Sequence, residues 1–143
     1  MEKYQPGTPL VLHTGISLQQ LVCNLIDRSW PVALHNRTHV VNQVGRELVL
    51  GFDNENVVSV IRDLLSAIIE HSCDGEIYIW AEKYSDVIIL LIEERNNNNG
   101  FALSFSIGSI EPYAARIGGH ISVEGIRQRK TLISFSFPAR FAA

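Results

Sequence analysis

The side chains best placed to do chemistry in this chain are carboxylates in its middle third. Asp63 and Glu70 lie on one amphipathic stretch, and Glu94 ends an apolar one. Asp63 could bind a cation, because hard divalent cations take oxygen ligands. The alternative interpretation, that Asp63 and Glu70 are solvated residues on the exposed face of a helix, stays open.

The sequence gives little support for other familiar catalytic motifs. His35 and His39 have the spacing of two zinc ligands on a helix, but no Glu follows the first, so we interpret them as a surface pair. The sequence has neither a phosphate-binding P-loop nor the Gly-x-Ser-x-Gly elbow of many hydrolases. We interpret Trp30 and Trp80 as packing residues.

Bulk composition indicates one soluble domain. The chain has 143 residues, 46% of them hydrophobic, and a net charge of −3. No basic stripe suggests a nucleic-acid partner. No signal peptide is visible and the apolar run at 87–92 is too short to span a bilayer, so we expect a cytoplasmic protein without membrane insertion. Cys23 and Cys73 are expected to be buried free thiols.

The residue pattern in the first third of the sequence predicts an extended lead-in, a helix and two strands. Residues 1–15 are rich in Pro and Gly and read as extended, and a single domain is expected over 16–143. Ser17 is a plausible N-cap for a helix that Pro31 would end. Residues 40–43 and 47–52 read as two strands joined by a turn at Gly45, after which Asp53 can cap the next helix. The apolar positions of these two helices fall at helical spacing: Leu18, Leu21, Val22, Leu25 and Ile26, then Val57, Ile61, Leu64, Leu65, Ile68 and Ile69.

The residue pattern in the rest of the sequence predicts two strands, one more helix and two further strands. A strand with alternating apolar residues opens at Gly75, and the near-continuous apolar run of residues 87–94 predicts a central strand. A helix is expected at 109–117, with Pro112 tolerated in its first turn. Residues 120–124 and 131–137 read as a final hairpin. Segregated hairpins and helices predict a two-layer α+β sandwich.

The order of these elements, together with two short motifs, resembles a known family. The stretch Asp63-Leu64-Leu65-Ser66-Ala67-Ile68-Ile69-Glu70-His71-Ser72 is followed at family spacing by Ile117-Gly118-Gly119-His120-Ile121. This series resembles the ATP-binding domain of sensor histidine kinases, a member of the GHKL ATPase superfamily. The resemblance implies a Bergerat-type sandwich, in which about three helices cover one face of a mixed, mostly antiparallel sheet.

The helix motif of that family carries two Asn residues, the second of which binds the magnesium ion that bridges the nucleotide phosphates. The matching positions here are Asp63 and Ala67. Ala67 has no oxygen to offer a metal, and Asp63 adds a negative charge near a triphosphate. Glu70 replaces a residue that is often Lys. The resemblance therefore predicts no metal ligand set here.

A second motif of the family, Asp-x-Gly-x-Gly, holds adenine with its Asp. Two registers are possible, and the preferred one puts Glu94 in the Asp place and Asn96 and Asn98 in the glycine places. After glycine, asparagine is the residue that best tolerates a left-handed backbone conformation. The alternative, a polar loop after a buried strand, stays open.

A third motif, Gly-x-Gly-Leu, lets backbone amides approach phosphate at a helix N-terminus. The matching glycine positions are Ser104 and Ser106. The segment of residues 100–109 is short and apolar. We therefore interpret it as a strand or packed loop rather than as the long mobile ATP lid of an active kinase. His13 lies in the short lead-in, and we do not expect the residues before Ser17 to form the helical hairpin that carries the family's phosphoacceptor.

Three functions follow from this. The favoured one is a degenerate histidine kinase-like ATPase domain that acts as a regulatory or protein-interaction module, without a cofactor, on a response regulator or on a kinase helical hairpin. The second is a diverged enzyme that still uses ATP and magnesium to phosphorylate a partner in trans. The third is a module that binds another small molecule between the long helix and residues 96–106.

Overall fold

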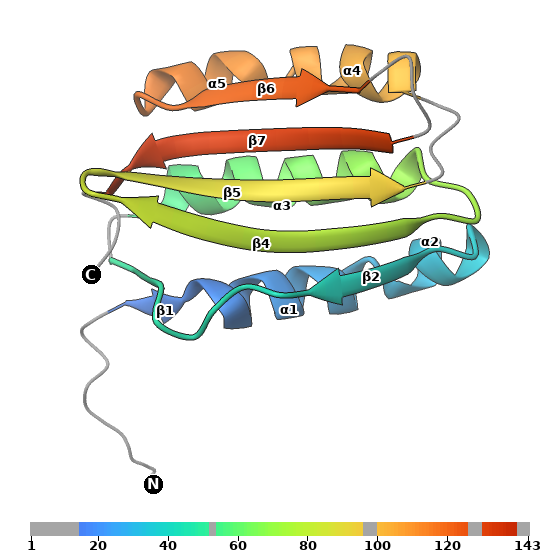
Figure 1. Cartoon of the computed structure of the whole chain (residues 1–143), viewed down its shortest axis with the longest axis horizontal. Coiled ribbons are helices and arrows are strands. Elements are labelled where there is room, and N and C mark those ends of the chain that lie inside the picture. The colour runs from blue at the N-terminus through green and yellow to red at the C-terminus, as the bar shows by residue number, and fades with distance from the viewer. Residues whose placement is uncertain (1–14, 52–53, 96–99, 126–129, 140–143) are drawn as a thin grey trace, which may run out of the picture.

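The structure, a computed structural model, describes residues 15–51, 54–95, 100–125 and 130–139. Its main layer is a five-stranded sheet with the order β2-β4-β5-β7-β6 (Figure 1). β2 runs parallel to β4, and every other neighbouring pair is antiparallel, which confirms the predicted mixed, mostly antiparallel sheet. The strands are β2 His39–Asn42, β4 Glu76–Tyr84, β5 Val87–Arg95, β6 His120–Glu124 and β7 Lys130–Pro138.

The helices form the second layer and lie behind one face of this sheet in Figure 1. Five helices lie within the described residues rather than the expected three or so, because two short ones were not predicted: α2 and α4. No helix in these ranges is both long and apolar enough to cross a membrane. The helices are α1 Leu18–Arg28, α2 Trp30–His35, α3 Glu55–Glu70, α4 Gly100–Gly108 and α5 Glu111–Arg116.

The core lies between α3 and the central strands. The predicted apolar stripe of α3 is buried, since residues three and four apart share one face of a helix. β5 is central, as predicted, and its residues alternate between buried and half-buried, with Ile88, Leu90 and Ile92 facing the helices. The same alternation continues to Glu94, so the pleat of the strand turns this carboxylate inward.

The first helix begins where it was predicted but ends earlier. The Ser17 side chain accepts a hydrogen bond from the Gln20 backbone N–H, which confirms the N-cap. The helix ends at Arg28, and Pro31 lies instead in the first turn of α2. Pro is tolerated there because the first amides of a helix have no intrahelical partner.

The two strands expected around Gly45 do not pair with each other, and this prediction was wrong. β2 pairs with β4, whereas β3 Val49–Leu50 pairs with β1 Ile16–Ser17 in a separate two-stranded sheet. Burial explains the choice, because Leu48 and Leu50 are turned into the core beside the start of α1. Asn54, without a capping side-chain bond, is the N-cap of α3, and Asp53 lies outside the described residues.

Residues 100–108 form α4, which corrects the prediction of a strand or packed loop. Leu103 and Ile107, one helical turn apart, are fully buried, whereas Phe101 and Phe105 are 68% and 88% exposed. Alternation of period two over seven residues fits either structure. α4 packs against α3 and thereby covers the C-terminal half of that helix.

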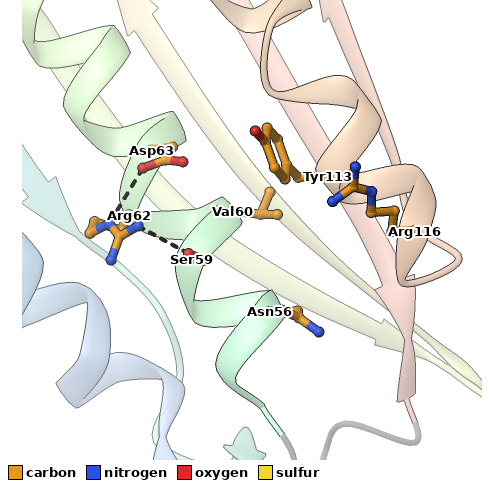
Figure 2. Close-up of a pocket in the computed structure, with 7 residues that line it drawn as sticks. All are labelled: Asn56, Ser59, Val60, Arg62, Asp63, Tyr113 and Arg116. Carbon is orange, nitrogen blue, oxygen red and sulfur yellow. Dashed lines mark hydrogen bonds and ion pairs between the residues drawn. The ribbon is translucent and has the colours of Figure 1, made fainter.

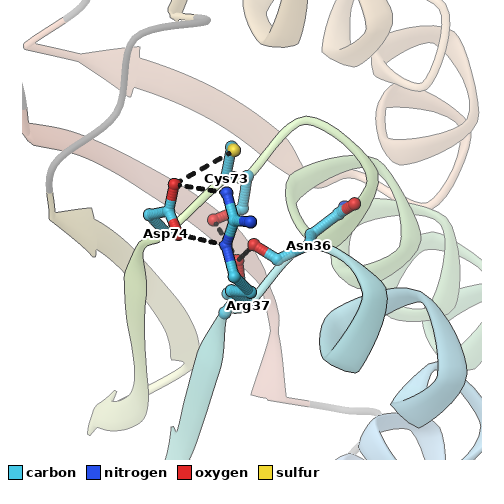
Figure 3. A network of polar contacts seen from close by, with 6 residues as sticks. Asn36, Arg37, Cys73 and Asp74 are labelled. Atoms are coloured by element: carbon cyan, nitrogen blue, oxygen red, sulfur yellow. Dashed lines mark hydrogen bonds and ion pairs between the residues drawn. The ribbon is translucent and has the colours of Figure 1, made fainter.

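Two turns at one end of the molecule are joined by a polar contact (Figure 3). Arg37, in the turn before β2, donates to both carboxylate oxygens of Asp74 at 2.5 and 2.9 Å, and Asp74 N donates to Asn36 O. Both thiols are free and exposed, so the expected burial was wrong: Cys73 lies beside Asp74, and Cys23 lies on the outer side of α1.

Candidate functional site

Two adjoining depressions lie between α3 and the α4–α5 segment. The first, which we call the Ala67 pocket, has a volume of about 380 Å³. The second, the Arg116 pocket, has a volume of about 460 Å³ and is shown in Figure 2. Asp63 and Tyr113 line both, so the two are continuous. The other lining residues are Ser66, Ala67, Glu70, Ser106, Ser109 and Ile110 in the first, and Asn56, Ser59, Val60, Arg62 and Arg116 in the second.

The Ala67 pocket brings together four of the residues singled out from the sequence: Asp63, Ala67, Glu70 and Ser106. Asp63 and Ala67 meet there because they are one turn apart on α3. The charged side chains that line the pocket are Asp63 and Glu70, both negative. Asp63 accepts a hydrogen bond from Arg62 Nε at 3.3 Å, and the Ala67 methyl is nearly buried.

α4 closes over the C-terminal end of α3 beside this pocket. The Ser106 hydroxyl and His71 Nε2 are 2.9 Å apart and share a hydrogen bond. Leu103 and Ile107, on either side of Ser104 and Ser106, are fully buried. The Ser106 side chain is therefore engaged by α3, and Ser104, which is half-buried, lines neither pocket.

Glu94 is the most unusual residue of the site. It is fully buried, and neither carboxylate oxygen has a hydrogen-bond partner within the described residues. Burial raises the pKa of Glu94 to about 7, because an ionised carboxylate is poorly solvated in the interior, and the nearby Ser72 hydroxyl opposes this rise. Glu94 lines neither pocket, so the structure does not bring it to the surface with Asp63 and Ala67.

Three further buried polar residues lie around Glu94, and sequence reasoning missed them. The Thr38 hydroxyl donates to the Ser72 hydroxyl at 3.0 Å, and Thr131 is the register partner of Glu94 on β7. Gly75 fits closely here, since a Cβ at this position would lie 2.7 Å from Ser72 Oγ and 3.0 Å from Glu94 Oε2. Only the strand register brings these residues together, and no local signal shows it.

The other positions predicted from the sequence do not form a site in the described residues. Asn96 and Asn98 lie outside the described residues. Within the described ranges, no group of three or more His, Cys, Asp or Glu side chains could hold a metal ion. His35 and His39 are both exposed, as expected of a surface pair, whereas Trp30 is 52% exposed rather than packed.

The Arg116 pocket contains functional groups that sequence reasoning missed. The Arg116 guanidinium lies over the Tyr113 ring, 5.2 Å from its centroid, and both residues come from α5. Figure 2 shows them facing Asn56, Val60 and Asp63 across the groove. The spacing of these α3 residues could have indicated a shared face, but only the packing of α5 opposes them to Arg116.

Comparison with known proteins gives a match in structure alone. No family model matches this sequence, and no curated protein matches it. The solved histidine kinase AdeS of Acinetobacter baumannii aligns with 86% of this chain at a TM-score of 0.71 and 14% identity, and this chain covers 65% of AdeS. Full-length ShkA in complex with AMPPNP aligns with 97% of the chain at a TM-score of 0.71 and 13% identity, and 33% of ShkA is covered.

A third protein, the histidine kinase ThkA, matches as an isolated domain and as part of a complex. Its nucleotide-free catalytic domain is 16% identical, with 86% of this chain and 92% of that domain covered and a TM-score of 0.65. ThkA in complex with the response regulator protein TrrA is 17% identical, with 86% and 40% covered and a TM-score of 0.61. These likenesses establish the architecture: the chain has the fold of the ATPase domain of histidine kinases.

Proposed function

We propose that this chain is a histidine kinase-like ATPase domain that works in two-component-type signalling as a regulatory or protein-interaction module, without ATP hydrolysis or phosphotransfer. The observation that carries the proposal is the packing of α4. Leu103 and Ile107 are buried, and Ser106 is bonded to His71 at 2.9 Å. A segment held in this way leaves the serines at the phosphate-binding positions little freedom to receive a nucleotide.

The chemistry of the Ala67 pocket supports the same proposal. Magnesium needs oxygen ligands, and the Ala67 side chain has none. The charged lining residues are Asp63 and Glu70, so a triphosphate would meet two negative charges and no positive one in this pocket. These residues do not suit a magnesium-bound triphosphate, and we propose that neither ATP nor magnesium is a cofactor.

The partner that we propose is another signalling protein, either a response regulator or a kinase helical hairpin. ThkA, which has the same fold, has been solved in complex with the response regulator TrrA. We place the module in the cytoplasm, where such partners would be met. Neither a nucleic acid nor insertion into a membrane is part of the proposal.

One observation favours a second candidate, an ATP-binding domain that phosphorylates a partner in trans. The resemblance puts Glu94 at the family's adenine-binding position, and its two oxygens lack partners among the described residues. A buried acceptor of this kind could receive a hydrogen bond from an amino group. ShkA, of the same fold, has been solved with AMPPNP.

Calorimetry with AMPPNP, with and without magnesium, separates the two candidates. We expect no heat of binding and no rise in melting temperature at millimolar nucleotide. Ala67→Asn alone should not restore binding, because the pocket would keep its negative charges. Micromolar, magnesium-dependent binding by the wild-type chain would overturn the proposal in favour of the second candidate.

A further inference from the structure

We infer that the Arg116 pocket binds a small organic anion, a carboxylate or a phosphate monoester attached to an aromatic or apolar body. The inference is independent of the proposed function, because the pocket lies beside the N-terminal half of α3 and the buried end of α4 does not line it. Of its lining residues, the family resemblance assigns a role only to Asp63.

The charges that line the Arg116 pocket do not cancel. Arg62 is balanced locally, because it donates to Asp63 at 3.3 Å and to the Ser59 hydroxyl at 3.0 Å. Arg116 has no carboxylate partner within the described residues, and its guanidinium contacts the Tyr113 ring. The pocket therefore carries one unbalanced positive charge in a chain whose net charge is −3.

The Arg116 guanidinium is preorganised by its neighbour on α5. Stacking on Tyr113 restricts the Arg116 side chain and leaves the N–H groups at the edge of the guanidinium free to donate. A planar guanidinium matches carboxylate and phosphate oxygens in a bidentate manner. Less side-chain freedom is then lost on binding than with an unrestrained arginine.

The wall of the pocket opposite Arg116 comes from α3. Asn56 and Ser59 supply neutral hydrogen-bonding groups, and Val60, which is 1% exposed, also lines the pocket (Figure 2). Tyr113 is 55% exposed, so part of its surface is available to a ligand. The volume of about 460 Å³ lies within the usual range for small-molecule sites.

The adjoining Ala67 pocket has charged lining residues of the opposite sign. Asp63 stands at the boundary, and the Ala67 pocket beyond it adds Glu70 and no basic side chain. An anion is repelled from that side and attracted toward Arg116. This charge distribution fixes the anionic group of the ligand at the α5 side of the groove.

The test is an NMR titration of the ¹⁵N-labelled chain with phenyl phosphate, with benzoate, and with uncharged benzyl alcohol. We expect at least one of the two anions to shift the amide signals of Asn56, Ser59, Tyr113 and Arg116, and benzyl alcohol to leave them in place. The anion that binds more tightly identifies the class of ligand. Arg116→Gln should weaken binding about tenfold or more, as expected for losing a charge-assisted bidentate contact.

The matched control is Arg28→Gln, which removes an exposed arginine from the last turn of α1. It should change the affinity less than about twofold, because a distant exposed charge is screened by salt. Tyr113→Leu keeps the charge but removes the stacking, and should weaken binding several-fold. Equal losses for Arg116→Gln and Arg28→Gln, shifts scattered over the surface, or no shift with either anion would overturn the inference.

Discussion

The two halves of α3 face very different surroundings. Its C-terminal half lies under α4, where Leu103 and Ile107 are fully buried and His71 is bonded to Ser106. Its N-terminal half faces α5 across the Arg116 pocket, which is lined mainly by polar and charged side chains. The difference teaches that one helix can be closed off at its end, where an uncharged apolar helix covers it, and can border a charged groove where its neighbour presents a tyrosine and an arginine.

The largest expected effect comes from disrupting the packing of α4 against the C-terminal end of α3. Leu103→Ala should lower the free energy of unfolding by about 3 kcal/mol, because it removes buried methyl groups and leaves a cavity between α4 and α3. Chemical denaturation monitored by circular dichroism would measure it. If the C-terminal half is sealed as described, the loss should come with faster hydrogen exchange at the end of α3.

Phe105→Ala is the matched control on the same helix. Phe105 is 88% exposed, so its truncation should change the free energy of unfolding by no more than about 0.5 kcal/mol. Equal losses for the two variants would mean that α4 does not pack through Leu103, and the comparison between the halves of α3 would fail.

The next effect depends on pH and on Glu94. The pKa of this group is raised from 4.5 to about 7 in the folded state, so the folded protein holds a proton that the unfolded chain gives up earlier. Stability should therefore fall as pH rises from about 4.5 to about 7, by about 3 kcal/mol in total. Glu94→Gln should remove this slope and be more stable than the wild type at pH 8.

The matched control here is Glu93→Gln on the solvent side of the same strand. Glu93 is paired with Arg95 at 3.1 Å and with Lys130 at 3.3 Å, so it does not share the buried surroundings of Glu94. This variant should keep the wild-type slope in melts between pH 4 and pH 8. A wild-type protein without any such slope would show that Glu94 is solvated.

The smallest expected effect tests the hydrogen bond between His71 and Ser106, which joins α3 to α4. Ser106→Ala should cost about 1 kcal/mol, since it removes the partner of His71 at a half-buried position. Ser66→Ala, on the exposed side of α3 in the Ala67 pocket, should cost less, and thermal melts of both would rank them. A larger loss of stability for Ser66→Ala than for Ser106→Ala would show that the His71–Ser106 hydrogen bond does not hold α4 against α3.

Most of the sheet and the long helix could be predicted from the sequence because their apolar periodicity is long. The stripe of α3 runs over sixteen residues, and β5 shows a nearly unbroken apolar run. The assignment of β2 and β3 to different sheets could not be predicted, because a four-residue strand carries no information about which distant strand will pair with it.

The site was predicted less completely than the fold. The sequence identified Asp63 and Ala67 because they share a helix, and their spacing alone places them together. It did not identify Arg116, whose role depends on how α5 lies against α3. Nor did it reveal that Glu94 is buried beside Ser72 and Thr131, since the register between β5 and β7 decides that.

The parallel alignment of β2 with β4 also has a consequence for synthesis on the ribosome. β4 and β5 are joined by a tight turn and can pair as soon as both have been made. β2 must wait for α3 and β4, because the Arg37–Asp74 contact at its start spans 37 positions. A nascent chain that stops within α3 therefore exposes β2 with no strand to receive its hydrogen bonds, and this stage is the one most open to proteases and chaperones.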